Sequence, residues 1–317
     1  MRKRTLVYIL FVFLLILSAA SLFIGTVKVA PQEMLTSPIL WTIRLPRILL
    51  AALAGILLAT SGVILQGVLR NPLADPYILG VSAGAGVGAA LGISTKLNFN
   101  LLGMSAVPLL AFVFALLAVL VVYQLSRLSS RNSPETLILA GVAVSAFASA
   151  VLALIIIISG QLQSIYFWLL GSFSLSSYSD VLTLLPYAVI GLLISYFYSK
   201  ELNAMLLGEE VAMTLGVEVE KIKWGMIVLA TLMTAAAVSV SGLVGFVGLI
   251  VPHFIRLLMG PHHRGLIPLA ALSGAILLVL ADTAARTVLS PMEIPVGIVM
   301  ALIGAPFFLY VLRRKKR

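Results

Sequence analysis

Three arginines of this sequence lie beside long apolar runs, where charged side chains are rare. Arg44 and Arg47 come just before one such run, and Arg286 comes just after another. A guanidinium group pairs with a carboxylate through two parallel hydrogen bonds, so the three arginines together predict an electropositive surface for an acidic partner. Two other interpretations stay open. Each arginine could instead reach lipid phosphates, and Asp282 lies one helical turn before Arg286, a spacing that allows an ion pair within one helix.

The segment 200–223 has the opposite charge character, because it holds five of the eleven acidic residues of the chain together with three lysines. Gly208-Glu209-Glu210 separates two short, mainly apolar stretches, 204–207 and 211–215, and Gly216 can end the second. This pattern predicts two short helices on the membrane surface. They could be an amphipathic linker resting on lipid or a docking platform for a cytoplasmic partner.

Glycine recurs every four residues at Gly80, Gly84, Gly88 and Gly92, with further small residues between these positions. Small residues at this spacing let two helix backbones approach closely. We therefore expect the four glycines to form a packing seam inside a helical bundle.

The loop just before these glycines, residues 70–76, contains Pro72 and Pro76. Proline interrupts a helix and restricts the residue that precedes it. The loop is therefore predicted to be a rigid turn at the cytoplasmic end of a transport pathway, although a simple connector would have the same sequence.

Several kinds of chemistry find no support in the sequence. No Gly-x-x-x-x-Gly-Lys-Ser/Thr phosphate loop is present, so we expect this chain not to hydrolyse ATP and to have no catalytic residues. The only histidines, His253, His262 and His263, have no carboxylate cluster near them in the sequence, and the chain has no cysteine. We therefore expect neither a metal site nor another cofactor.

The elements that position these residues are membrane-spanning helices. Of the 317 residues, 61% are apolar and only 10% are charged, which excludes a soluble domain. A helix needs about 20 apolar residues to cross the bilayer core. The sequence predicts an all-α polytopic fold with one transmembrane domain, 1–317, and about ten crossings: 6–24, 48–68, 77–93, 107–122, 137–158, 181–198, 224–240, 246–259, 266–280 and 294–311. Of these, 77–93 and 246–259 are the weaker predictions.

The basic residues fix the expected orientation, since cytoplasmic loops are enriched in Lys and Arg. Ten crossings with both termini in the cytoplasm put 16 of the 21 basic residues inside and leave five outside: Lys28, Arg44, Arg47, Lys96 and Arg286. The net charge of +10 then reflects topology and contact with anionic lipid, not nucleic acid.

The outer segment 165–171, Ile-Tyr-Phe-Trp-Leu-Leu-Gly, is aromatic and too short to cross a membrane. It could belong to an interfacial aromatic belt. It could also be a re-entrant helix at the mouth of a pathway, provided that its backbone ends face protein or water.

Longer motifs occur in order over nearly the whole chain: Arg44-Leu-Pro-Arg47, Gln66-Gly67, Asn71-Pro-Leu-Ala-Asp-Pro76, Leu79-Gly-Val-Ser-Ala-Gly-Ala-Gly86, the run from Gly242 to His253 with Arg256, Leu280-Ala-Asp282 with Arg286, Glu293-Ile-Pro-Val-Gly297 and Gly304-Ala-Pro306. With these motifs the sequence resembles the FecCD-type permeases of bacterial iron-siderophore, haem and cobalamin ABC importers, the type II importers.

The resemblance implies partners: a second permease subunit, either a copy of this chain or a paralogue, two cytoplasmic ATPases that hold ATP and Mg, and a periplasmic or lipid-anchored binding protein. It also implies roles for residues. Arg44, Arg47 and Arg286 would receive acidic residues of the binding protein, and Asn71 and Leu73 would form the cytoplasmic gate. The residues that would couple to the ATPase are Leu207, Gly208, Glu209, Glu210, Ala212, Leu215 and Gly216. The loop 131–136 departs from the family pattern at Ser133-Pro134-Glu135.

The function implied by the resemblance is import of an iron chelate across the bacterial inner membrane by alternating access, driven by the partner ATPases. A ferric siderophore is the favoured cargo, with haem, cobalamin and molybdate as alternatives. An ion-coupled secondary transporter is the competing class. Such a transporter has little use for the acidic segment 200–223, and ionisable residues in mid-membrane are scarce.

Overall fold

The computed structural model of the protein describes residues 3–27, 36–97, 99–101, 104–128 and 134–314. In this part of the chain, seven helical segments are long and apolar enough to span a membrane. They are α1 (Lys3–Phe23), η2 (Ile39–Arg44) continuing into α2 (Leu45–Val68), α4 (Ala106–Leu128), α5 (Pro134–Ser159), α7 (Tyr178–Phe197), α10 (Val219–Ser241) and α12 (His263–Ala285). Three shorter apolar helices, α3 (Val81–Thr95), α11 (Val247–Met259) and α13 (Val296–Arg314), lie where the other three crossings are predicted.

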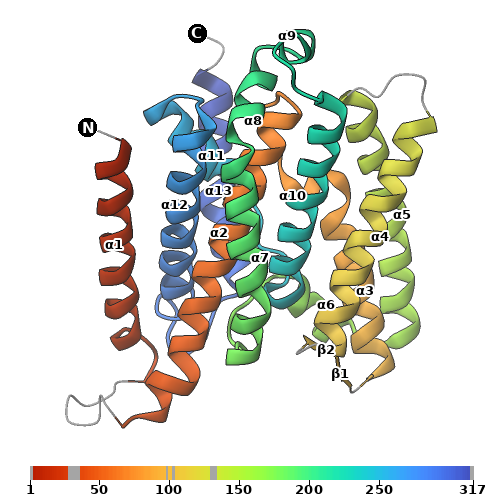
Figure 1. Ribbon diagram of the computed structural model, residues 1–317. Coiled ribbons are helices and arrows are strands. Elements are labelled where there is room, and N and C mark those ends of the chain that lie inside the picture. The colour runs from red at the N-terminus through yellow and green to blue at the C-terminus, as the bar shows by residue number, and fades with distance from the viewer. Residues whose placement is uncertain (1–2, 28–35, 98, 102–103, 129–133, 315–317) are drawn as a thin grey trace.

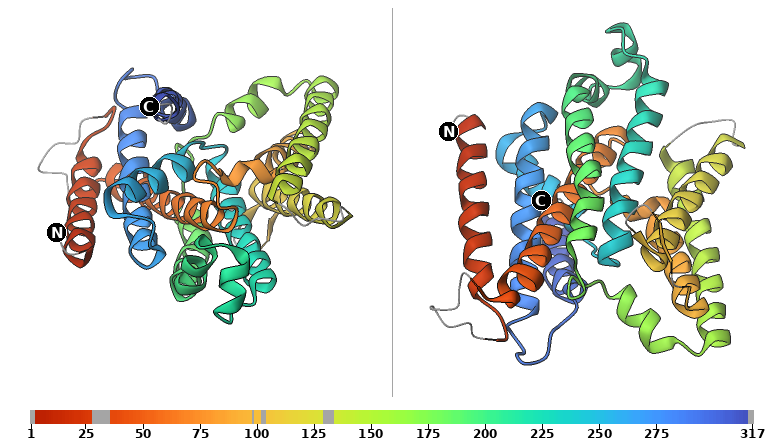
Figure 2. Two further views of the ribbon diagram at one scale, coloured as in Figure 1. Left: turned by 90° about the horizontal axis from the view of Figure 1, so that it is seen from above. Right: turned by 60° about the horizontal axis from the view of Figure 1, so that its bottom comes forward.

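The helices form one bundle around α2, which packs against α12, α10, α7 and α11 (Figures 1 and 2). Close backbone contact explains why α2 is rich in small residues. A Cβ atom added at Gly55 would lie 2.2 Å from the carbonyl oxygen of Gly274 in α12, and one added at Gly62 would lie 2.0 Å from that of Gly248 in α11. Only glycine lets the neighbouring helices approach α2 this closely.

Three of the four regularly spaced glycines face α4. A Cβ atom added at Gly84 would lie 2.4 Å from the Phe114 carbonyl oxygen, and one added at Gly88 would lie 2.2 Å from the Leu110 carbonyl oxygen. A Cβ atom added at Gly92 would lie 3.1 Å from Val107. Gly80 has a different structural role. It has a left-handed backbone with φ of 82° and joins the 3-10 turn η3 (Pro76–Leu79) to α3.

The prediction of an all-α chain needs one correction, because α3 and α4 are joined by a short antiparallel pair of strands, β1 (Asn100–Leu101) and β2 (Met104–Ser105). The chain reverses direction there, and the pairing satisfies backbone groups that no helix can satisfy. The aromatic segment is the short helix α6 (Leu162–Leu169). Its carboxyl end packs on protein, since the carbonyl oxygens of Trp168 and Leu170 lie against Gly242 and Gly297.

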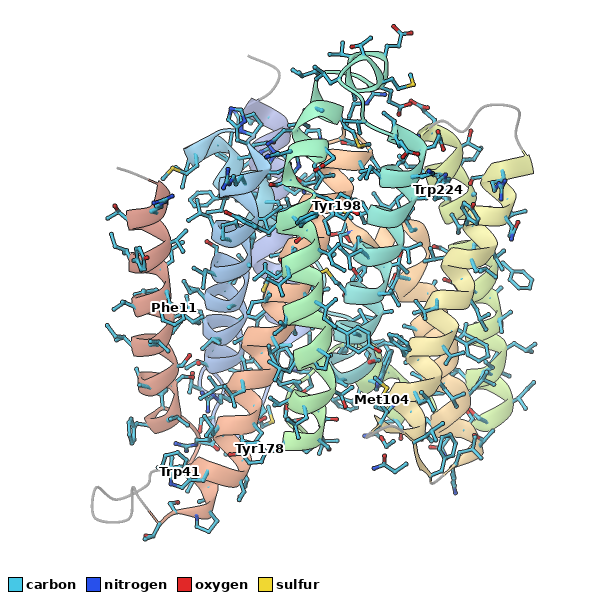
Figure 3. All side chains as sticks on the ribbon, in the orientation of Figure 1. Phe11, Trp41, Met104, Tyr178, Tyr198 and Trp224 are labelled. Atoms are coloured by element: carbon cyan, nitrogen blue, oxygen red, sulfur yellow. The ribbon has the colours of Figure 1, made fainter. Side chains whose placement is uncertain are left out.

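The bundle has two distinct ends. The start of α1, the end of α13 and the helices α8 (Ser199–Leu206) and α9 (Glu209–Thr214) lie at one end, called here the α9 end (Figure 1). The strands, α6 and the start of α2 lie toward the other, called here the α6 end (Figure 1). Labelled side chains mark both ends, with Trp41 and Tyr178 near the α6 end and Trp224 toward the α9 end (Figure 3).

Candidate functional site

The α6 end contains a buried cluster of charged side chains centred on Arg47. Its Nε atom donates to both carboxylate oxygens of Asp282, at 2.9 and 3.0 Å, and its Nη1 atom lies 2.8 Å from Oε2 of Glu293. Arg286 lies 3.8 Å from the same aspartate and donates to the backbone oxygen of Ser21 at 2.7 Å. The cluster therefore ties together the start of α2, the end of α12, the end of α1 and the segment before α13.

Arg44 extends this arrangement toward α1, because its guanidinium group donates to the carbonyl oxygens of Leu22 and Val27. A helix leaves its last carbonyl groups without partners, and Arg44 satisfies one of these at the end of α1. Arg44, Arg47 and Arg286 thus lie at one end, as the sequence predicts, but they are only 5%, 5% and 2% exposed. Their partners in this structure are groups of the same chain.

A cavity of about 580 Å³ lies at the same end, between α6 and the adjoining ends of α4 and α10. Glu293, Asp180, Trp168 and several serines contribute to its lining: Ser105, Ser164, Ser172, Ser174, Ser239 and Ser241. Nothing in the sequence singled out these serines, because they are scattered over four segments that only the fold brings together. Because Glu293 also pairs with Arg47, the cavity adjoins the Arg47 cluster.

At the α9 end, the loop 70–76 is held by its own side chains. Oδ1 of Asn71 accepts a hydrogen bond from the Leu73 amide at 3.0 Å, and Oδ1 of Asp75 accepts one from the Tyr77 amide at 2.8 Å. Burial raises the pKa of Asp75 to about 6, and the hydrogen bond from the Tyr77 amide opposes that rise. The Tyr77 hydroxyl bonds both the carbonyl oxygen and the amide of Val244, at 3.0 and 3.1 Å. The predicted rigid turn therefore has a defined hydrogen-bonded structure.

The predicted pair of short helices is present as α8 and α9. α8 begins at Ser199, directly after α7, while α9 is bounded by Gly208 and Gly216, whose φ values are 118° and 82°. Ala212 is buried, but the apolar side chains around it are exposed: Leu207 by 68%, Val211 by 44%, Met213 by 56% and Leu215 by 63%. α9 lies at the extreme end of the bundle (Figure 1).

Charged contacts connect α9 to the bundle. Oε1 of Glu209 lies 3.5 Å from the Arg70 guanidinium group and 3.4 Å from the Lys223 ammonium group. Glu210, the next residue, is exposed. In the loop 131–136, where the sequence departs from the family pattern, residues 131–133 lie outside the described part of the chain and residues 134–136 form the start of α5.

Comparison with known proteins identifies the family of this chain. Residues 12–314 match the FecCD transport family. The chain belongs to this family. The resemblance to iron-siderophore, haem and cobalamin permeases is thereby confirmed.

Named relatives of this FecCD chain match it over most of its length. It is 46% identical over 279 residues to the cobalamin import system permease protein BtuC of Halobacterium salinarum, covering 88% of this chain and 74% of that protein. It is 38% identical over 331 residues to the hemin transport system permease protein HmuU of Yersinia pestis, covering 99% and 97%. Its structure superimposes on a solved metal-chelate type ABC transporter in an inward-facing conformation with a TM-score of 0.88 and 35% identity, covering 98% of this chain and 99% of that one.

Proposed function

We propose that this FecCD chain is the permease subunit of an ABC importer that moves an iron chelate across the bacterial inner membrane by alternating access. The observation that carries the proposal is the apolar surface of α9, formed by Leu207, Val211, Met213 and Leu215. Side chains of this kind, exposed at the extreme end of a bundle, are typical of a protein-binding surface. Family membership makes an ATPase the partner that fits it.

The charge bias and the shape of the bundle support the orientation that we propose. Ten crossings would return both termini to the side of α9, and the start of α1 and the end of α13 lie at that end (Figure 1). The α9 end would then face the cytoplasm, and the chain would act as one transmembrane domain. The assembly would contain two permease subunits, two ATPases that hold ATP and Mg, and a binding protein at the α6 end.

The cargo is proposed from the relatives. They include permeases named for cobalamin, for hemin and, in Bacillus subtilis, for Fe(3+)-citrate. We propose an iron chelate, with a ferric siderophore as the first candidate and haem and cobalamin as the alternatives to test.

Docking of the binding protein at the α6 end remains our proposal for Arg44, Arg47 and Arg286, with one change. Since these arginines are buried and paired within the chain, we propose that they shape the docking surface from beneath. An acidic residue of the partner could reach them only by displacing a partner such as Glu293, which is partly exposed.

The experiment is co-purification of this chain with the ATPase subunit of its transport system. Met213→Asp places a charge in the apolar surface of α9, and we expect it to lower the recovered ATPase at least about tenfold, which corresponds to about 1.4 kcal/mol. The control is Leu175→Asp, since Leu175 is 95% exposed in the segment between α6 and α7. This variant makes the same chemical change at the opposite end and should recover the ATPase in full.

Recovery of the ATPase by Met213→Asp at the wild-type ratio would contradict the proposed surface. The complex is then placed in lipid, and its ATPase rate is measured with binding protein loaded with a ferric siderophore, haem or cobalamin. Stimulation by one loaded protein identifies the cargo, whereas the lack of any associated ATPase would favour a secondary transporter.

A further inference from the structure

The Glu209 carboxylate lies where α9, α10 and the loop 70–76 meet. Glu209 is the first residue of α9, Arg70 opens the loop 70–76 just after α2, and Lys223 lies in the second turn of α10. One oxygen, Oε1 of Glu209, faces both cations, at 3.5 Å from Arg70 and 3.4 Å from Lys223. The α9 helix is thus connected electrostatically to α10 and to the loop.

The two cations differ in burial, which gives the two contacts different roles. The Lys223 side chain is 1% exposed, whereas that of Arg70 is 41% exposed. A buried ammonium group is stabilised by a nearby negative charge, and the Lys223 contact joins Glu209 to α10. Arg70 sits at the surface and can follow Glu209 when α9 moves.

Arg70 has an unusual backbone conformation at the start of the loop 70–76. Its φ is 48°, in the left-handed region that a non-glycine residue seldom occupies. Past Arg70, the Asn71 and Asp75 side chains hold the turn, and Tyr77 binds both backbone groups of Val244. A displacement of Arg70 therefore acts on a loop that is hydrogen-bonded as far as the α10–α11 connection.

We propose that the Arg70–Glu209 ion pair transmits movement of α9 to the loop 70–76, with Arg70 as a positioning residue for transport. The apolar surface of α9 binds the ATPase, and the charged side of α9 passes the displacement to the bundle. This inference rests on the proposed ATPase docking, but it concerns a contact between α9 and the loop 70–76 and not the apolar surface of α9. It separates two properties of α9, namely binding of the ATPase and coupling of its turnover to transport.

The test uses the full complex in lipid vesicles with its binding protein, and it measures cargo imported per ATP hydrolysed. Arg70→Gln removes the guanidinium charge but leaves the apolar surface of α9 intact. We expect unchanged recovery of the ATPase and at least a fivefold loss of cargo per ATP. Arg70→Lys keeps a positive charge within reach of Glu209 and should restore most of that loss, which a purely steric role would not do.

Two further variants complete the test. Glu209→Gln should lower cargo per ATP at least as much as Arg70→Gln does, since it also removes the Lys223 contact. Adding Arg70→Gln to Glu209→Gln should give no further loss, because the Arg70–Glu209 contact is already gone. The matched control is Glu218→Gln, since Glu218 is an exposed carboxylate of the same segment, and its ion pair among the described residues is with the neighbouring exposed Lys221. It should import as the wild type does.

A wild-type ratio of cargo to ATP in Arg70→Gln, or an equal loss in Glu218→Gln, would overturn the inference and leave the docking proposal standing. Failure of the wild-type chain to recover any ATPase would instead contradict the docking proposal.

Discussion

Replacement of Arg47 by methionine will leave the Asp282 carboxylate buried with Arg286 as its nearest cation, 3.8 Å away. In the wild type, Arg47 donates to both oxygens of this carboxylate, and the two side chains are 6% and 2% exposed. Loss of one partner of a buried ion pair costs about 3–5 kcal/mol, because the remaining charge keeps its desolvation penalty. Glu293 also loses its contact, but it is 36% exposed and can turn toward water, which adds less than about 1 kcal/mol.

The free energy of unfolding of Arg47→Met should therefore fall by about 3–5 kcal/mol. Asp282→Asn should cost less, since Arg47 keeps Glu293. The double variant should be more stable than the sum of the single effects predicts, by about 2–3 kcal/mol.

The assay is reversible unfolding of the purified chain in detergent micelles by increasing fractions of denaturing detergent, with a double-mutant cycle over the two positions. Arg264→Met is the matched control. Arg264 is an exposed arginine at the other end of α12, with one long hydrogen bond to Tyr196, and its loss should leave the midpoint unchanged. An effect of Arg47→Met below about 1 kcal/mol, the size of a surface pair, would refute the buried pairing and favour an arginine that is free to bind a partner directly.

Two other predictions concern single sites. Because the folded state raises the pKa of Asp75 from 3.8 to about 6, it keeps a proton that the unfolded chain has released. This contribution to stability is present below about pH 4 and is lost as the pH rises to about 6. Asp75→Asn should remove that loss, which raises the melting temperature at pH 7 and adds at most about 3 kcal/mol to the free energy of unfolding. If the variant's stability depended on pH as the wild type's does, the buried carboxyl group would be contradicted. Gly88→Ala should destabilise the chain, because its Cβ atom would lie 2.2 Å from the Leu110 carbonyl oxygen, whereas Gly225→Ala in α10 meets nothing within 4 Å. The latter should be neutral or stabilising by up to about 1 kcal/mol, and equal melting temperatures for the two variants would count against the α3–α4 packing.

The sequence predicts the helices well because apolar runs of membrane length have few alternative structures. Apolar helices occur in all ten predicted regions, and the weaker predictions, 77–93 and 246–259, are shorter helices in the structure. The start of α8 is less predictable. The apolar pattern suggests a helix from Ala204, but α8 begins at Ser199 because the helical chain continues almost unbroken past Tyr198.

The sequence predicts less about the candidate sites, because their partners are distant in the chain. The three arginines are correctly brought together at one end, yet Arg47 and Glu293 are separated by 246 positions, and Arg44 binds carbonyl groups that no residue type identifies. The spacing in the sequence predicts only the ion pair of Asp282 with Arg286. In the structure this pair is 3.8 Å long, whereas Arg47 lies 2.9 Å from Asp282 and makes the hydrogen bonds to it.

The two ends of the bundle also differ in the strength of the ion pairs that join their helices. At the α6 end, the buried Arg47–Asp282 pair joins α2 to α12, and breaking it would cost several kcal/mol. At the α9 end, the half-exposed Arg70–Glu209 pair is 3.5 Å long, and such a pair contributes less than about 1 kcal/mol. The ion pair that joins α9 to the loop 70–76 is therefore weaker than the pair that joins α2 to α12. Rearrangement during transport should begin at the α9 end, while the α6 end keeps its paired structure until a partner competes for Arg47.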